Sequence, residues 1–222
     1  MRDINIEWLT RAAEFDHLFN TRWLGERFFH LPGDMLAIQD LIWHIRPECI
    51  VQTGIAAGGG AIFSASMLEL TGGEGRVIAI DPRLRESVGQ RLQAHRLVHR
   101  IVLIEGESCA TSTLETVRKH VEGRAPVMVI LDLTHTHEHV LRELECYAQF
   151  VTPGSYVIVM DTMMEYLPAK MFEGKPYGKG NNPATAAAAF LARDTRFEVD
   201  GDIEDRVVMT LSPDGFLKRV RQ

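Results

Sequence analysis

The chain has 222 residues, of which 45% are hydrophobic, and its formal net charge is −6. A chain of this size and apolar content can bury a core without help from disulfides or metals, which excludes disorder as its main state. The mild acidic excess, with no clustered basic stripe, disfavours nucleic acid as a partner. We therefore expect one globular domain over residues 1–222.

The cysteines and the apolar runs indicate the compartment. Cys49, Cys109 and Cys146 lie inside apolar or helical patterns rather than at the spacing of metal ligands. They are interpreted as small reduced thiols of a cytoplasmic protein. The N-terminus carries no apolar signal core, and no apolar run approaches the roughly 20 residues that span a bilayer, so no membrane partner is expected.

The predicted elements begin with two amphipathic helices, over Asn5–Phe19 and Asp34–Ile45. Residues 1–46 are interpreted as a helical cap on a sheet or as part of an interface. From Cys49 onward, short runs rich in Val and Ile alternate with helical stretches, which is typical of βα units wound into a parallel sheet. The predicted strands are Cys49–Gln52, Arg76–Ile80, Ile101–Glu105, Val127–Asp132, Tyr156–Asp161, Phe197–Val199 and Arg206–Ser212. The predicted helices between them are Ala61–Leu70, Arg85–Val98, Thr113–Val121, His137–Phe150 and Pro183–Ala192.

Residues 162–182 form an unusually long connection before the last of these helices, and such loops are commonly lids or binding loops. Tyr166, Phe172 and Tyr177 could stack there on a substrate ring or simply anchor the loop. The helix after the connection is expected to begin at Pro183, with Asn182 as its N-cap.

Ligands of parallel sheets bind at the carboxyl ends of strands, near the point where the strand order reverses. The first predicted strand ends in a glycine-rich loop, Gln52-Thr53-Gly54-Ile55-Ala56-Ala57-Gly58-Gly59-Gly60. Glycines let the backbone approach a ligand, and the helix N-terminus that follows favours a carboxylate or a phosphate. The spacing is not G-x-G-x-x-G, which disfavours a pyrophosphate-binding dehydrogenase.

The second strand ends at Asp81, where a carboxylate can accept hydrogen bonds from both hydroxyls of a ribose. The alternative is that Asp81 and Pro82 only begin a turn, which both residue types favour. With the glycine loop upstream, we favour ribose binding. After the third strand, Gly106-Glu107-Ser108 is suited to packing against a base ring, although Gly and Ser are also common in ordinary loops.

Two carboxylates, Asp132 and Asp161, follow the fourth and fifth strands. Because both are reached from long apolar runs, they are costly to place there unless they meet a cation, a hydrogen-bond donor or solvent. We therefore predict that Asp132 and Asp161 form the catalytic pair. They could hold a hard divalent ion such as Mg²⁺, which prefers oxygen ligands.

Histidines follow Asp132 at alternating positions, as His135, His137 and His139. Since a helix is expected to begin near Thr136 or His137, only one or two of them can face the cleft, and a three-histidine zinc site is not expected. His135 is nearest the strand end. Histidine titrates near neutrality, which suits a general base for a substrate hydroxyl. The alternative leaves all three histidines merely polar.

A series of short motifs runs from Trp23 to Arg219. They are Trp23-Leu24-Gly25, Leu31-Pro32-Gly33-Asp34, Thr53-Gly54-Ile55-Ala56 with Gly58-Gly59, Ile62-Phe63-Ser64-Ala65-Ser66-Met67-Leu68, His135-Thr136-His137-Glu138-His139-Val140-Leu141, Gly154-Ser155-Tyr156, Tyr177-Gly178-Lys179-Gly180-Asn181-Asn182-Pro183 and Ser212-Pro213-Asp214-Gly215-Phe216-Leu217-Lys218-Arg219. With the glycine loop and the acidic strand ends, they resemble the cephalosporin hydroxylase and rhamnosyl O-methyltransferase family of class I methyltransferases.

That resemblance implies a Rossmann-like α/β fold with a seven-stranded, mostly parallel sheet, whose last strand is antiparallel and which carries an N-terminal helical extension. It implies S-adenosylmethionine as the cofactor, lying across the first two strand ends. The implied cofactor-binding residues are Gln52, Thr53, Gly54, Ala56, Gly58, Gly59, Ser64, Asp81, Gly106, Glu107, Ser108 and Asp132. Family habit also suggests a homo-oligomer.

The resemblance carries over a metal site and a base. In related metal-dependent sugar O-methyltransferases, Mg²⁺ is held by an Asp after the fourth strand and by an acidic pair after the fifth. Those positions match Asp132 and the pair Met160-Asp161, and the histidine that serves as base matches His135. Gln52 stands where the family usually has Glu, and Met160 replaces the first acid of the pair. Because a thioether is a poor ligand for Mg²⁺, only Asp132 and Asp161 would remain, and metal dependence is left open.

We therefore predict an S-adenosylmethionine-dependent O-methyltransferase that acts on a hydroxyl of a small natural product or a deoxysugar. His135 would remove the hydroxyl proton, and Asp132 and Asp161 would orient the acceptor with or without Mg²⁺. Two alternatives remain. One is an enzyme of this fold with another reaction, such as a cyclisation, and the other is a non-catalytic partner subunit that binds the cofactor.

Overall fold

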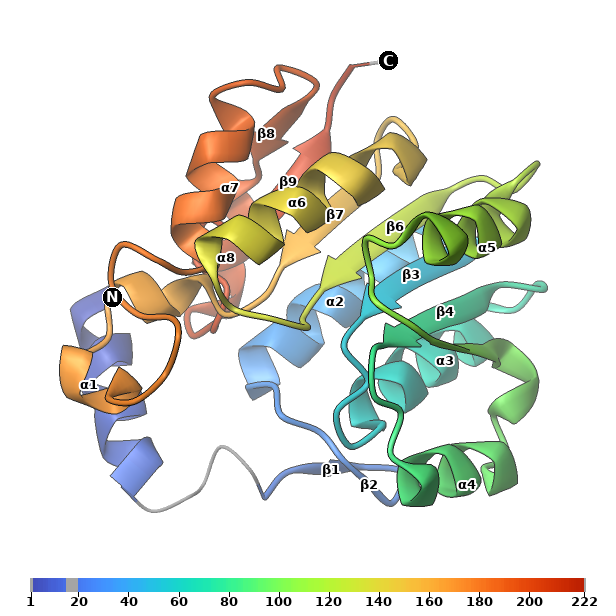
Figure 1. Cartoon of the computed structure of the whole chain (residues 1–222), viewed down its shortest axis with the longest axis horizontal. Helices are drawn as coiled ribbons and strands as arrows, with labels where there is room; N and C mark the ends of the chain where they lie inside the picture. Colours follow the sequence, from blue (N-terminus) through green and yellow to red (C-terminus); the bar gives the residue numbers. More distant parts are fainter. Residues whose placement is uncertain (1, 15–19, 222) are drawn as a thin grey trace.

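The computed structural model of the chain describes residues 2–14 and 20–221. Its central feature is a seven-stranded sheet with the strand order β5-β4-β3-β6-β7-β9-β8 (Figure 1). The first five strands in this order run parallel, and β9 runs antiparallel to both of its neighbours. The expected α/β sheet with an antiparallel last strand is therefore confirmed. Its strands are β3 (Cys49–Thr53), β4 (Arg76–Asp81), β5 (Ile101–Glu105), β6 (Val127–Leu131), β7 (Tyr156–Val159), β8 (Phe197–Val199) and β9 (Phe216–Arg219).

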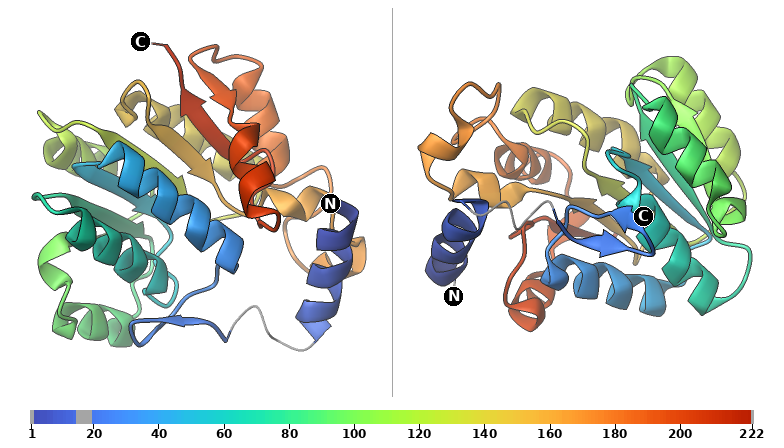
Figure 2. Two further views of the ribbon diagram at one scale, coloured as in Figure 1. Left: turned by 180° about the vertical axis from the view of Figure 1, so that it is seen from behind. Right: turned by 90° about the horizontal axis from the view of Figure 1, so that it is seen from below.

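Helices cover both faces of the sheet, which explains why its central strands are continuously apolar. Every residue of β3, β6 and β7 is buried, as expected for parallel strands with helices on either side. One face packs against α2 (Pro32–Ile45), α3 (Gly59–Thr71), α4 (Glu86–Ala94) and α8 (Gly201–Val207). The other face packs against α5 (Thr111–Val121), α6 (His137–Tyr147) and α7 (Pro183–Leu191), and the two views in Figure 2 show the layers from behind and from below.

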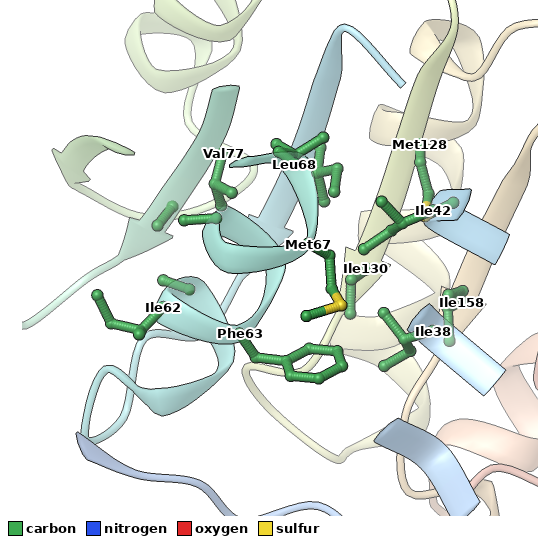
Figure 3. Packing of buried hydrophobic residues seen from close by; sticks show 14 of the residues in the cluster. Ile38, Ile42, Ile62, Phe63, Met67, Leu68, Val77, Met128, Ile130 and Ile158 are labelled. Atoms are coloured by element: carbon green, nitrogen blue, oxygen red, sulfur yellow. The ribbon is translucent and has the colours of Figure 1, made fainter. Parts of the chain in front are cut away.

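The larger core lies between the sheet and the pair α2 and α3. Ile38 and Ile42 of α2 and Ile62 of α3 are buried there, against Ile130 of β6 and Ile158 of β7 (Figure 3). Burying a side chain of this size contributes roughly 1.5–3 kcal/mol, so this layer fixes α2 firmly on the sheet. The segment that leads into α2 is thereby held close to the ends of the strands.

The N-terminal segment and the long connection meet at one end of the sheet. Helix α1 (Arg2–Glu14) covers the first part of the predicted helix, whose end at Phe19 lies outside the described residues. Leu9 of α1 is buried with Leu31 and Met163, and the latter belongs to a short 3-10 helix over Thr162–Glu165. A second 3-10 helix follows at Ala169–Phe172. None of the described helices combines the length and apolar content that crossing a bilayer requires.

A two-stranded hairpin precedes α2. Strands β1 (Arg22–Trp23) and β2 (Glu26–Arg27) pair in antiparallel fashion around Leu24 and Gly25, which both have positive φ angles. Such a two-residue turn matches the twist of the flanking strands. The Trp23 indole donates a hydrogen bond to Ser66 of α3 over 2.9 Å. The hairpin is therefore fastened to the helix that follows the glycine loop.

The predicted strand over Arg206–Ser212 is wrong. Residues up to Val207 belong to α8, and the last strand in the chain is β9, which lies between β7 and β8 and begins after the turn at Pro213 and Asp214. The run of Val and Met residues that suggested a strand packs instead beside α2 and the long connection. The main-chain N–H of Leu211 donates to Asp34 over 3.1 Å, which keeps this segment out of the sheet.

The other boundaries agree with the prediction to within a few residues. The Asn182 side chain accepts hydrogen bonds from the main-chain N–H groups of Ala184 and Thr185, so its predicted N-cap role is confirmed. The predicted helix His137–Phe150 ends at Tyr147 and continues as a 3-10 turn. The predicted helix Arg85–Val98 ends at Ala94.

Candidate active site

The strand order reverses beside β3, which is the first strand of this sheet along the chain. The chain runs from β3 outward to β4 and β5 and then crosses back to β6, which pairs with the other edge of β3. The carboxyl ends of β3 and β6 therefore border a switch point, where open parallel sheets bind their ligands. Residues that follow these strands are the ones to examine for chemistry.

Two glycines of the loop after β3 are required by the protein's own packing. Gly54 has a φ of +87°, and a Cβ atom there would lie 2.0 Å from the Asp132 carbonyl oxygen. A Cβ atom on Gly59 would lie 2.1 Å from the Arg27 carbonyl oxygen of the hairpin. These contacts explain part of the glycine richness without a ligand, because Gly54 lets the ends of β3 and β6 meet.

Gln52 lies at the start of the same loop and is buried. Its side-chain Nε2 donates to the Gly54 carbonyl oxygen over 3.2 Å. Its Oε1 has no hydrogen-bond partner among the described residues. A buried acceptor without a partner costs free energy, so Gln52 offers an acceptor to a ligand donor next to the N-terminus of α3.

Asp81 ends β4 and binds two backbone donors. Its Oδ2 accepts from the Ile55 N–H over 3.0 Å, which ties the glycine loop to β4. Its Oδ1 accepts from the Arg83 N–H over 2.9 Å, so Asp81 does begin the turn that was the alternative to ribose binding. A carboxylate has about four acceptor positions, so these two bonds leave capacity for ribose hydroxyls.

The loop after β5 carries the predicted base-ring contacts. The Gly106 N–H donates to the Asp81 carbonyl oxygen over 3.0 Å. Ser108 is fully buried, its hydroxyl lies 3.4 Å from His139 Nε2, and its carbonyl oxygen accepts from the Tyr147 hydroxyl over 2.6 Å. Ser64 is also buried, within α3. The Gly106 backbone is therefore bonded to the end of β4, while Ser108 contacts His139 and Tyr147 of α6.

Asp132, His135 and Asp161 converge after β6 and β7. Each offers one ligand atom, and these atoms lie within 4.8 Å of one another. His135 Nδ1 lies 3.6 Å from Asp161 Oδ2. Asp161 has a φ of +61°, a conformation that is uncommon outside glycine and that concentrates at functional sites. The predicted catalytic residues are thus brought together.

Electrostatics sets this group apart from the surface carboxylates. The pKa of Asp161 is raised to about 6, chiefly by burial; His135 opposes this rise, and the negative charge of Asp132 contributes to it. Carboxyl groups with pKa values displaced by burial and by a charged neighbour are concentrated at functional sites.

The other two histidines of the alternating series do not join the group, as expected. His137 Nδ1 lies 2.8 Å from the Thr185 hydroxyl of α7. His139 Nε2 lies 3.4 Å from Glu143 Oε1, one turn further along α6, and this carboxylate raises the pKa of His139. Only His135 of the three therefore contacts the carboxylate pair.

The aromatic residues of the long connection differ in position. The Tyr177 ring lies 5.1 Å from the His135 ring in an edge-on arrangement, and Phe172 packs against Tyr177 at 6.1 Å. Burial raises the pKa of the Tyr177 hydroxyl, and the charge of Asp161 adds to that rise. The Tyr166 hydroxyl lies 3.5 Å from Asp214. Tyr177 therefore borders the site.

Met160 does not supply the missing acidic ligand. Its side chain is 1% exposed and belongs to the larger core, and the Ser212 hydroxyl donates to its Sδ atom over 3.4 Å. The donor set that remains for a divalent ion is Asp132 and Asp161, with His135 beside them. Two carboxylates fit such an ion in charge and in spacing.

His30 is a site residue that the sequence reasoning missed. It lies in the segment between β2 and α2, is 7% exposed, and places Nε2 at 3.3 Å from Asp132 Oδ2. Its only local signal was its position directly before the Leu31-Pro32-Gly33-Asp34 motif. Because His30 is far from Asp132 in the chain, the local sequence pattern cannot predict the contact between them.

The chain is similar to known proteins over most of its length. The model of the family described as Rhamnosyl O-methyltransferase/CmcI matches residues 16–220. A rhamnosyl O-methyltransferase of Mycobacterium bovis is 23% identical over 210 residues, which covers 90% of this chain and 78% of that protein. The rhamnosyl O-methyltransferase of Mycobacterium leprae is 25% identical over 202 residues, covering 90% of this chain and 83% of that protein.

Solved structures share the fold. An apo structure of CmcI has a TM-score of 0.62 and 20% identity, with 91% of this chain and 77% of that chain covered. CmcI with Mg-SAM has a TM-score of 0.61 and 21% identity, over 90% and 77% of the two chains. An O-methyltransferase from Bacillus cereus in complex with SAH has a TM-score of 0.57 and 16% identity, over 88% and 82%. The expected Rossmann-like class I methyltransferase fold is therefore confirmed.

Proposed function

The chain belongs to the rhamnosyl O-methyltransferase/CmcI family, and from that premise we propose that it methylates a hydroxyl of a sugar or another small natural product. Family membership confirms the enzyme class, an S-adenosylmethionine-dependent methyltransferase. The curated relatives are named for methylation of a rhamnosyl group, which makes a sugar hydroxyl the acceptor we favour. The observation that carries the proposal is the convergence of Asp132, His135 and Asp161 beside the glycine-loop edge of the sheet.

The cofactor is proposed to lie across the ends of β3 and β4. The N-terminus of α3 favours the carboxylate of its amino-acid part, and the free Oε1 of Gln52 can accept from its ammonium group. Asp81 would bind the ribose hydroxyls with the acceptor capacity that Ile55 and Arg83 leave. The backbone of Gly106 and Glu107 would border the base.

The acceptor is proposed to sit between Asp132, His135 and Asp161. His135 removes the hydroxyl proton while the acceptor oxygen bonds to the methyl carbon and the bond from that carbon to sulfur breaks. The sulfonium thereby becomes a neutral thioether. Methyl transfer gains chiefly from holding donor and acceptor in line and close, so the fixed positions of these side chains supply most of the rate. Tyr177 and the connection over residues 162–182 would close over the acceptor and exclude water.

A divalent ion fits this proposal without being required by it. Asp132 and Asp161 would hold Mg²⁺, and the ion would supply positive charge beside the acceptor oxygen. Because Met160 is turned into the core, the protein contributes fewer acidic ligands than the related metal-dependent enzymes, and weaker binding of Mg²⁺ is expected.

The experiment is incubation of the pure protein with S-adenosylmethionine and a panel of rhamnosyl glycosides and hydroxylated natural products, with and without Mg²⁺. Release of S-adenosylhomocysteine in equal amount to a methylated product supports the proposal. Conversion of an acceptor without that release supports a cyclisation. Tight cofactor binding with neither outcome supports a non-catalytic partner subunit, and both of these results contradict the proposal.

Self-association also stays a proposal. Leu36 and Trp43 of α2 are 60% and 48% exposed, and Trp8 of α1 is 41% exposed. Large apolar side chains that are exposed on the surface are suited to a protein interface. Sedimentation of the pure chain measures the assembly directly.

A further inference from the structure

His30 is buried at the site, yet the reaction proposed above gives it no part. Its Nε2 lies 3.3 Å from Asp132 Oδ2, and the His30 and Asp132 side chains are 6% and 24% exposed. Neither ring nitrogen has a well-aligned hydrogen bond among the described residues. A buried imidazole in this state is costly unless the contact to the carboxylate compensates for its lost solvation.

The backbone on both sides of His30 is anchored, so the ring cannot easily turn away from Asp132. On one side, the Phe28 N–H donates to the Thr21 carbonyl oxygen over 3.0 Å, and the Phe28 ring packs edge-on against the His30 ring at 4.5 Å. On the other side, the Leu31 N–H donates to Asp34 over 3.1 Å. These contacts hold the imidazole in one place.

Asp34 extends this support to a distant segment. It is fully buried, accepts a hydrogen bond from the Thr210 hydroxyl and accepts another from the Leu211 N–H. Gly33 beside it allows a close approach, because a Cβ atom there would collide with the Met209 carbonyl oxygen. The segment that carries His30 is therefore fastened to residues 209–211 as well as to α2.

The site consequently contains two pairs of aspartate and histidine. His30 contacts Asp132, and His135 contacts Asp161 over 3.6 Å. The four residues come from the β2–α2 segment, the end of β6, the loop before α6 and the end of β7. The side chains of Asp132, His135 and Asp161 are 24%, 22% and 23% exposed, whereas the His30 side chain is 6% exposed.

We propose that His30 is a positioning residue, which donates from Nε2 to Asp132 and fixes that carboxylate so that its other oxygen faces the acceptor. The proposal rests on the proposed function, since it assigns Asp132 its orientation in that reaction. Carboxylates that ligate a metal are usually held by such an outer hydrogen bond, and losing it typically costs about 10–100-fold in metal affinity or activity, which sets the size of effect expected for Asp132.

The kinetic test compares His30→Phe with His30→Gln. Phenylalanine keeps a ring against Phe28 but cannot donate, whereas the glutamine amide can donate to Asp132. We expect His30→Phe to lower kcat about 10–100-fold, with the dissociation constant of S-adenosylmethionine and the Tm near those of the wild type. His30→Gln should regain most of the lost kcat. His44→Gln, at an exposed α2 histidine that pairs with Asp40, is the matched control.

Equal activity of His30→Phe and the wild type contradicts the proposal, and so does an equal loss in His30→Phe and His30→Gln. If kcat falls in both variants and their Tm values drop by the same amount, His30 has a purely structural role. This outcome also overturns the proposal.

The contact itself is tested by the imidazole ¹⁵N–¹H spectrum of the full chain. A solvent-protected Nε2–H signal is expected in the wild type, absent in His30→Gln and displaced in Asp132→Asn. A missing signal, or one that Asp132→Asn leaves unmoved, overturns the proposal. This readout needs no turnover, so failure of the wild type to release S-adenosylhomocysteine contradicts the proposed function alone.

Discussion

The proposed site has a cofactor half and an acceptor half, and the two are built in different ways. On the proposed cofactor half, at the ends of β3, β4 and β5, most contacts involve backbone groups. Asp81 binds the N–H groups of Ile55 and Arg83, and Gly54 lies against the Asp132 carbonyl oxygen. On the acceptor half, side chains from separate parts of the chain converge, as His30 and Asp132 do.

This difference separates binding from chemistry. Short loops that are fixed by backbone hydrogen bonds hold their shape and leave little room for additional side chains. Such a region suits the binding of a cofactor. The proposed acceptor half consists of clustered titratable side chains, among which the pKa of Asp161 is raised chiefly by burial, and such a group suits the movement of a proton. Substitutions on the two halves should therefore change different measured quantities.

The largest effect is expected on the acceptor half. His135→Gln removes the proposed base, and kcat should fall roughly 10²–10⁴-fold, the usual contribution of general-base catalysis. The dissociation constant of S-adenosylmethionine, measured by calorimetry, should stay unchanged. His137→Gln is the matched control, because His137 contacts Thr185 of α7 rather than the carboxylates. Similar kcat values for the two variants would contradict the proposal that His135 is the general base.

The next effect is expected at the contact between the ends of β3 and β6, where the two halves meet. Gly54→Ala places a Cβ atom 2.0 Å from the Asp132 carbonyl oxygen and forces a side chain into a φ of +87°. Steric crowding of this kind typically costs about 1–3 kcal/mol of unfolding free energy, and the left-handed backbone adds about 1–2 kcal/mol.

Gly123→Ala separates these two costs. Its φ is +72°, but a Cβ atom there meets nothing within 4 Å, so this variant should show only the backbone cost. Urea denaturation of both variants measures the difference. Equal midpoints would mean that β3 and β6 do not pack at Gly54 as described.

The smallest effect is expected on the cofactor half. Asp81→Asn keeps an oxygen for the Ile55 N–H but loses the negative charge, and the dissociation constant of S-adenosylmethionine should rise about 10-fold. The kcat at saturating cofactor should change little. Glu86→Gln at the start of α4 controls for the general loss of charge. If the cofactor affinity of Asp81→Asn is unaltered, Asp81 does not bind the ribose and only stabilises the turn.

The sequence predicted where the glycine loop, Asp81 and the carboxylate pair lie relative to the strands, but it did not predict the place of His30, and locality explains why. The glycine loop and Asp81 lie directly after strands whose apolar runs are easy to recognise, so their place follows from the strand ends. His30 lies near Asp132 only because α2 packs on the sheet, and no local pattern records that packing.

Two further details depended on tertiary contacts. The burial of Met160 beside Ser212 could not be read from the strand pattern, which places a residue on a face but does not name its neighbours. The apolar residues around Val207 and Met209 suggested a strand, but Asp34 binds the main chain that follows them. In each case a long-range hydrogen bond decided the outcome.

The hydrogen bonds from Thr210 and Leu211 to Asp34 join segments that lie 176 and 177 residues apart in the chain. Closing so long a loop costs chain entropy, which is offset only when the contact is complete. We therefore expect the segment that carries His30 to reach its final place late in folding, after the more local pairing of β3, β4 and β5.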